Sequence, residues 1–255
     1  MKIGEACFQI RSSSNFFIMY SFQHILFLDI ETAPQYPDYH SLPKDWKALW
    51  DIKAGYLIRN KEIETPDSIY PRAGIYAEFG KIICIGCGFI TGEGDQKKIT
   101  VKSFYGDNEK IVLAEFCEML TKWSAKEQKW LCAHNGKEFD FPYLCRRLII
   151  NGLTIPSLLN VSGKKPWEVN HLDTLELWKF GDFKSYTSLN LLAHTLDIPT
   201  PKDDIDGSMV WSVYWNDKDL QRIVTYCQKD VITLARIFLK MNNEPGIKPE
   251  NIILK

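Results

Sequence analysis

The chain has 255 residues, of which 45% are hydrophobic and 25% are charged. These fractions are close to those of ordinary globular domains and argue against intrinsic disorder, collagen-like repeats and coiled coils. The 31 basic and 32 acidic residues give a net charge of −1, so bulk charge does not indicate an electrostatic clamp for nucleic acid. We expect one compact domain with room for an inserted subdomain.

Hydropathy and cysteine usage indicate the compartment. No stretch reaches the roughly 18 apolar residues that a membrane helix requires, and the first 20 residues lack the uninterrupted apolar run of a signal peptide. The seven cysteines are an odd number, and most stand in apolar segments, where a reduced thiol packs as a small hydrophobe. We therefore expect a cytoplasmic protein without membrane contact and with reduced thiols.

The first predicted strand is the continuously apolar run at residues 24–30. A short apolar run followed by threonine and proline is typical of a strand that is buried on both faces and central in a sheet. Residues 1–22 show little periodicity and predict an N-terminal extension, within which Met19 is an alternative start of the chain.

The order of the later elements predicts the fold class. Residues 34–80 are polar, aromatic and rich in proline, and they predict an insertion that caps one side of the domain. The elements that follow are strands at 81–90 and 98–105 joined by a turn, a helix capped by Asp107 or Asn108, a strand at 130–133, a helix at 140–151, an extended segment at 169–174, and helices at 187–196 and 217–240. This is an α/β order, and we assign the domain to residues 23–242 with a C-terminal tail at 243–255.

Two carboxylates, Asp29 and Glu31, stand at the end of the first predicted strand. At a spacing of two residues their side chains leave the same face of the sheet, so they share one small site. In apolar surroundings such a pair is costly, because of desolvation and mutual repulsion, unless a cation neutralises it. Taken alone, the pair fits a solvated strand end as well as a metal site.

The second motif is HNGKEFDFPYL, at residues 134–144, where a strand passes through a tight turn into a helix. Asp140 fits a helix start, because the helix dipole favours an acid in the first turn. His134 fits a hydrogen-bond partner that fixes the loop. Asn135 fits either a structural turn or a turn that brings the backbone close to a nucleotide, and Phe139 fits the core.

The third motif, YCQKD, places Tyr226 and Asp230 four residues apart in the longest predicted helix. Their side chains share one face, with Cβ atoms roughly 5–6 Å apart. Alone, the pair is explained by a surface hydrogen bond between a phenol and a carboxylate. Together, the three motifs supply four carboxylates and one tyrosine in the order strand, loop with helix, and final helix.

This combination resembles the DEDD 3′–5′ exonucleases of the ribonuclease-H-like fold, and the Tyr-x-x-x-Asp form of the last motif is similar to the DEDDy branch. ILFLDIETAP resembles the first exonuclease motif, HNGKEFDFPYL the second and YCQKDV the third. The likeness is to the stand-alone bacterial group related to the proofreading domain of B-family DNA polymerases, and it spans about residues 24–240. It implies an α/β fold with a mixed five-stranded sheet flanked by helices.

The resemblance also implies a function: hydrolysis of single-stranded DNA from its 3′ end to nucleoside monophosphates, in repair or proofreading. Two Mg²⁺ or Mn²⁺ ions would be held by oxygen ligands that suit them. Asp29 would bridge both ions, Glu31 and Asp230 would complete the first site, and Asp140 would serve the second. Tyr226 would orient the attacking water, because a phenol with a pKa of about 10 is a poor base at neutral pH. The residues expected to contact the substrate are Ile30, Thr32, His134, Asn135 and Phe139.

Other interpretations of the same sequence stay open. The motifs do not discriminate DNA from RNA, so a 3′–5′ exoribonuclease would carry the same site. A non-catalytic nucleic-acid-binding module would keep the fold without turnover, although all five motif residues are present. Nothing in the sequence indicates a protein partner.

Two further groups are candidates for metal binding. Cys84 and Cys87 form a C-x-x-C motif that a zinc-binding interaction domain would use, but no further ligand stands nearby at a suitable spacing. Its place in an apolar strand favours a structural role. His171 and Asp173 could also coordinate a metal, although in a strand a packed polar pair is the commoner outcome.

Overall fold

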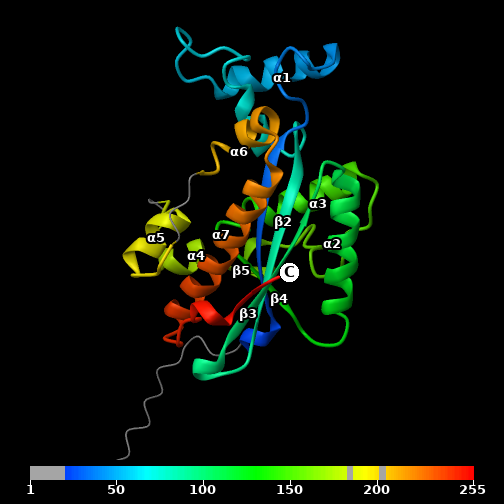
Figure 1. The fold of residues 1–255 in the computed structure, drawn as a ribbon. Coiled ribbons are helices and arrows are strands. Elements are labelled where there is room, and N and C mark those ends of the chain that lie inside the picture. Colours follow the sequence, from blue (N-terminus) through cyan, green and yellow to red (C-terminus); the bar gives the residue numbers. More distant parts are fainter. Residues whose placement is uncertain (1–20, 183–185, 201–204) are drawn as a thin grey trace, which may run out of the picture.

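The computed structural model describes residues 21–182, 186–200 and 205–255. Its centre is a mixed sheet, with β1 antiparallel to β2 and parallel to β4 (Figure 1). The strands lie in the order β5-β4-β1-β2-β3-β6. Their bounds are β1 (Ile25–Pro34), β2 (Gly80–Thr91), β3 (Lys98–Tyr105), β4 (Trp130–Ala133), β5 (Leu172–Asp173) and β6 (Ile252–Leu254). The predicted α/β class with a mixed sheet is confirmed, and the sheet has six strands rather than five.

The sixth strand comes from residues 243–255, which we expected to form a tail. Ile252–Leu254 pairs in parallel with Ile99–Val101 of β3. A three-residue strand shows no periodicity in the sequence, because it depends on hydrogen bonds to a strand about 150 positions earlier. The predicted N-terminal extension lies outside the described residues except for Ser21 and Phe22.

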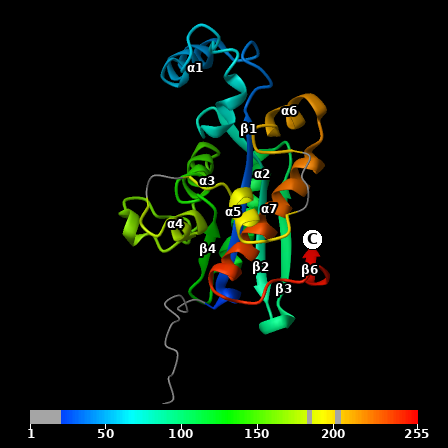
Figure 2. The same cartoon turned by 90° about the vertical axis from the view of Figure 1, so that its left-hand side faces the viewer.

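Helices cover both faces of the sheet. They are α1 (Lys44–Leu57), α2 (Glu109–Trp123), α3 (Asp140–Ile150), α4 (Thr174–Lys179), α5 (Leu189–Thr195), α6 (Val210–Ser212) and α7 (Leu220–Met241). Figures 1 and 2 show α2 and α3 on one face and α7 on the other, with α4 and α5 on the side of α7. No helix of the described chain combines the length and the apolar character needed to cross a membrane.

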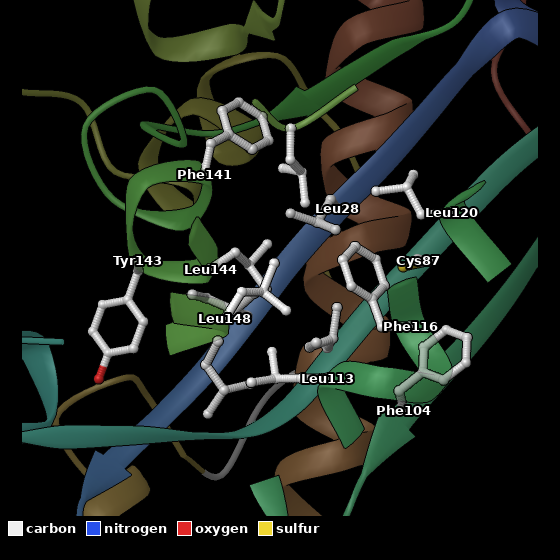
Figure 3. Packing of buried hydrophobic residues seen from close by; sticks show 14 of the residues in the cluster. Leu28, Cys87, Phe104, Leu113, Phe116, Leu120, Phe141, Tyr143, Leu144 and Leu148 are labelled. Carbon is white, nitrogen blue, oxygen red and sulfur yellow. The ribbon is translucent and has the colours of Figure 1, made fainter. Parts of the chain in front are cut away.

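The alternation of β1 explains why both faces are covered. Leu26 and Leu28 pack in a cluster with α2 and α3, whereas Ile25 and Phe27 pack in a second cluster with α7. Figure 3 shows Leu28 among apolar side chains of this first cluster, which include Phe116 of α2 and Leu144 of α3. Because successive side chains point to opposite faces, a continuously apolar strand is buried on both.

The chain between β1 and β2 contains α1 and lies at the top of Figure 1. Trp50 of α1 is fully buried there in edge-to-face contact with Tyr70, at a centroid distance of 5.4 Å. The insertion is joined to α3, because the Tyr143 hydroxyl donates to the Gly74 carbonyl at 2.7 Å. Trp50 and Tyr70 therefore belong to a small core of their own at one end of the sheet.

Two glycines of β2 let α7 lie close to the sheet. A Cβ atom added to Gly86 would lie 2.8 Å from Cys227 Sγ and 2.9 Å from Val231 Cγ2, and one added to Gly88 would lie 2.7 Å from Val231 Cγ1. Gly86 is also the residue that pairs with Asp29 of β1. The close approach therefore occurs directly beside the predicted catalytic strand.

We expect Gly86→Ala to destabilise the protein by about 1–3 kcal/mol, because overpacking forces backbone shifts in a tightly packed core. Gly55→Ala is the matched control, since a Cβ at this helical position meets nothing within 4 Å. The control should stabilise the protein by about 0.5–1 kcal/mol through helix propensity. Urea denaturation measures both changes, and equal effects of the two substitutions would contradict the proposed close approach.

Candidate active site

Asp29 and Glu31 lie on the face of β1 that α7 covers, because they continue the alternation of Ile25 and Phe27. One carboxylate oxygen of each acid lies within 4.8 Å of the other and of Cys227 Sγ. The pairing register with β2 shifts between Glu31 and Thr32, and such irregularities redirect side chains next to functional sites. The two acids thus share one small site.

Asp140, at the start of α3, is held against β1 by its backbone. Its Oδ1 accepts a hydrogen bond from the Ile30 N–H at 3.1 Å, and the side chain is buried. The backbone of the preceding turn explains two of its residues. Asn135 has a φ of 63°, a left-handed conformation that asparagine adopts more readily than most residues. A Cβ at Gly136 would lie 2.3 Å from Ala133 Cβ. The second motif therefore encodes the path that brings Asp140 to Asp29.

Tyr226 and Asp230 project from one face of α7 toward the same acids. The Tyr226 hydroxyl donates a hydrogen bond to Asp230, and the charges of Asp230, Glu31 and Asp29 add to the rise of the phenol pKa that burial causes. The charge of Asp230 also raises the pKa values of Asp29 and Glu31. The third motif therefore lies within electrostatic reach of the first.

Burial is the largest cause of the raised pKa values of the acids in this cluster. It raises the pKa values of Asp29 and Glu31 well above their usual range, and neighbouring carboxylates raise them further. Burial also raises the pKa of Asp140 to about 7. No lysine or arginine of the described residues pairs with these three acids. Asp29 Oδ2 is buried without a hydrogen-bond partner, as expected of an atom that a cation would ligate.

A pocket of about 880 Å³ opens onto the cluster. Asp29, Tyr226, Asp230 and His134 line it, whereas Glu31 and Asp140 do not. The remaining lining residues are Tyr186, Ser188, Leu189, Asn190, Thr200, Ile205, Asp206, Gly207, Met209 and Thr233. Our prediction of the site missed this wall. Its nearest signal is the DIDGSMVW stretch, which contributes four of these residues.

Comparison with known proteins identifies the family. Residues 75–247, about two thirds of the chain, match the family described as predicted 3′–5′ exonuclease related to the exonuclease domain of PolB. The chain belongs to this exonuclease family. The matched segment contains Asp140, Tyr226 and Asp230 and begins after β1, so Asp29 and Glu31 lie outside it.

Solved structures include similar folds. One is the family B DNA polymerase from the hyperthermophilic archaeon Pyrobaculum calidifontis, with 15% sequence identity and a TM-score of 0.46. The similarity covers 85% of this chain and 25% of the polymerase chain, so the exonuclease corresponds in length to a quarter of that protein. No curated protein matches the chain.

Two of the predicted substrate-contacting residues of the exonuclease lie beside its acids rather than in the pocket wall. The Ile30 side chain is buried in the cluster with α2 and α3, and its N–H is used by Asp140. The Thr32 hydroxyl hydrogen-bonds to the Tyr143 hydroxyl. Both residues therefore join the catalytic strand to α3.

The other three belong to the turn before α3. His134 lines the pocket, but both ring nitrogens are engaged: Nδ1 lies 2.9 Å from Thr174 Oγ1, and Nε2 lies 2.8 Å from the Thr187 carbonyl. Burial lowers its pKa, so the neutral ring donates to this carbonyl. Asn135 is half-buried, and Phe139 packs against Tyr143. Only His134 of the five lines the pocket.

Asp173 has a role that sequence reasoning missed. Its carboxylate accepts hydrogen bonds from the backbone N–H groups of Asn135 at 2.9 Å, Lys137 at 3.0 Å and Leu175 at 2.9 Å. It caps α4 and fixes the turn of the second motif at once. His171 packs on Phe141, and burial lowers its pKa to about 4. The residues described contain no metal cluster built on this pair.

The C-x-x-C motif does not form a chelating pair. Cys84 contacts Val224 and Cys227 of α7, whereas Cys87 belongs to the cluster with α2. Residues three apart in a strand point to opposite faces, so the two thiols are separated by the sheet. The structure therefore supports the packing role of these cysteines.

The raised pKa values predict how stability depends on pH without metal. Unfolded carboxyl groups titrate near pH 4, whereas Asp140 titrates at about 7 in the folded protein. In EDTA, unfolding releases protons between these values, so the free energy of unfolding should fall as pH rises from about 4 to about 7. Urea denaturation at several pH values measures this slope.

Asp140→Asn is the control for that slope, because it removes one of the titrating groups. The variant should show a smaller decrease with pH. Adding Mn²⁺ at pH 8 should restore stability to the unaltered protein, since ligation favours the deprotonated carboxylates. A rise in stability between pH 4 and 7 in EDTA would contradict the arrangement of acids.

We expect Asp173→Ala to destabilise the protein by about 2–4 kcal/mol, because it removes a helix cap and leaves the N–H groups of the turn unpaired. Asp219→Ala is the matched control: Asp219 caps α7 through one exposed hydrogen bond of 3.0 Å to the Arg222 N–H, worth about 1 kcal/mol. Chemical denaturation distinguishes the two, and equal losses would exclude the double role of Asp173.

Proposed function

We propose that this exonuclease hydrolyses single-stranded DNA from the 3′ end, releasing nucleoside monophosphates in a reaction that requires two divalent metal ions. The observation that supports the proposal is the convergence of acids on Asp29: it shares one site with Glu31, and the charges of Asp140 and Asp230 reach it. Asp29, Asp230 and Tyr226 also line one pocket. Three distant segments supply these side chains. Burying several carboxylates together costs folding free energy. A stabilising role therefore does not explain why they are placed side by side.

The residues fit a divalent cation by their chemistry. Asp29 offers a buried oxygen without a partner, and Asp140 keeps Oδ2 free of the hydrogen bond that Ile30 makes to Oδ1. Hard oxygen donors suit Mg²⁺ or Mn²⁺. Asp29, Glu31 and Asp230 would hold one ion, and Asp29 and Asp140 a second. When bound, such ions lower the pKa of a water and stabilise charge on a leaving oxygen.

Tyr226 is assigned to positioning the attacking water. Burial and the neighbouring carboxylates keep the pKa of its phenol above the usual value, so the group stays protonated at neutral pH. A protonated phenol that donates to Asp230 can still accept a hydrogen bond from a water. It therefore orients the nucleophile without acting as the base.

DNA is the proposed substrate because the family is related to the exonuclease domain of a DNA polymerase. RNA is the second candidate, since a 3′–5′ exoribonuclease would carry the same three motifs. Action in repair or proofreading follows from the same relationship. Digestion of matched DNA and RNA strands in parallel measures the preference directly.

The deciding experiment digests single strands that carry a label at the 5′ end, with Mg²⁺, Mn²⁺ or EDTA. We expect a ladder that shortens from the 3′ end with either metal and no products in EDTA. Strands labelled at the 3′ end should release labelled mononucleotide at once. Metal-independent cleavage, or products that begin at the 5′ end, would contradict the proposal.

Variants connect the activity to the cluster. Asp29→Asn and Asp230→Asn should each lower the rate by more than about 100-fold, because even outer-shell partners of a metal contribute about 10–100-fold. Tyr226→Phe should cost less, roughly 10–100-fold. Asp45→Asn, at an exposed position of α1, is the matched control and should retain full activity. Turnover unchanged in Asp29→Asn would refute the assignment.

A further inference from the structure

Tyr186 is an exposed aromatic residue of the pocket wall. Its side chain is 65% exposed, and it makes no hydrogen bond or ring contact within the described residues. An aromatic ring gains free energy when its faces leave water. The position therefore suits a ligand that presents a flat apolar surface.

The neighbours of Tyr186 hold it in place beside the acids. The next residue, Thr187, accepts a hydrogen bond from His134 Nε2 at 2.8 Å, and Ser188 caps α5. The charges of Asp140 and Asp173 reach the phenol, because they add to the rise of its pKa that partial burial causes. The backbone next to Tyr186 is thus tied to the turn that carries Asp140.

Tyr186 and Tyr226 line the same pocket from different elements. Tyr226 belongs to α7 and hydrogen-bonds to Asp230, whereas Tyr186 precedes α5 and is reached by the charge of Asp140. The cleaved phosphate must lie at the acids, so the terminal nucleotide must occupy the adjoining space. A pocket of about 880 Å³ is within the range that encloses a small ligand.

We propose that Tyr186 is the surface on which the base of the substrate's 3′-terminal nucleotide stacks. The inference rests on the proposed function and adds a substrate-binding residue to it. The base is the part of the nucleotide that suits this wall, because the cleaved phosphate lies at the acids and the exposed ring of Tyr186 offers a flat apolar surface. Since every base has a π-face, stacking tolerates all four bases. The enzyme should therefore remove each of them.

The test compares KM and kcat on two strands that differ only in their 3′-terminal residue, a normal nucleotide or an abasic one. On the normal strand, Tyr186→Ala should raise KM by about 5- to 100-fold, the fold-change expected from losing one stacked base. Tyr186→Phe and Tyr186→Trp should stay within about 3-fold of the unaltered protein. On the abasic strand, Tyr186→Ala and the unaltered protein should have equal KM values.

Each alternative role of Tyr186 gives a different pattern. A hydroxyl contact would make Tyr186→Phe as weak as Tyr186→Ala, and a structural or backbone contact would make the loss persist on the abasic strand. Either result overturns the inference. Tyr56→Ala is the matched control, because Tyr56 is 85% exposed on α1 and does not line the pocket. It should leave both KM values unchanged.

A binding measurement separates this inference from the proposed function. In the Asp29→Asn background, a strand ending in 2-aminopurine should lose fluorescence on binding, because stacking on an aromatic ring quenches this base. Tyr186→Ala should abolish the quenching. Quenching that depends on Tyr186 without any cleavage by the unaltered protein would refute the proposed function alone. Cleavage with quenching independent of Tyr186 would refute the stacking inference alone, and absence of binding would refute both.

Discussion

The close packing of α7 against β1 and β2 is the constraint on which the catalytic cluster depends. Gly86 and Gly88 leave no side chain between the helix and the sheet, so Cys227 and Val231 lie directly on β2. The helix period then places Tyr226 and Asp230 on the face that looks toward Asp29. A helix held a side chain's width farther out would move Asp230 away from Asp29.

The same closeness creates the electrostatic cost of the site. Burial and mutual repulsion raise the pKa values of Asp29 and Glu31, and no basic side chain of the described chain compensates them. The fold sustains this cost with backbone hydrogen bonds around the acids. The Ile30 N–H binds Asp140, and Asp173 fixes the turn before it. Functional sites commonly break the local rules of stability and are supported from elsewhere.

The substrate side of the pocket has a different origin from the catalytic side. The acids come from three motifs, whereas the opposite wall comes from the segments around α5 and before α6. His134 joins the two sides, because its ring nitrogens contact Thr174 and the Thr187 carbonyl. This arrangement couples the position of Tyr186 to that of Asp140.

The sequence by itself determined the α/β class, the central strand, the helix beginning at Asp140 and the shared face of Tyr226 and Asp230. These features follow from periodicity and spacing, which act within a few residues. Only the tertiary structure decided the sixth strand, the role of Asp173 and the wall that contains Tyr186. Each depends on contacts between residues far apart in the chain. Asp173, for example, binds N–H groups more than 30 positions earlier, and no local pattern records such a partner.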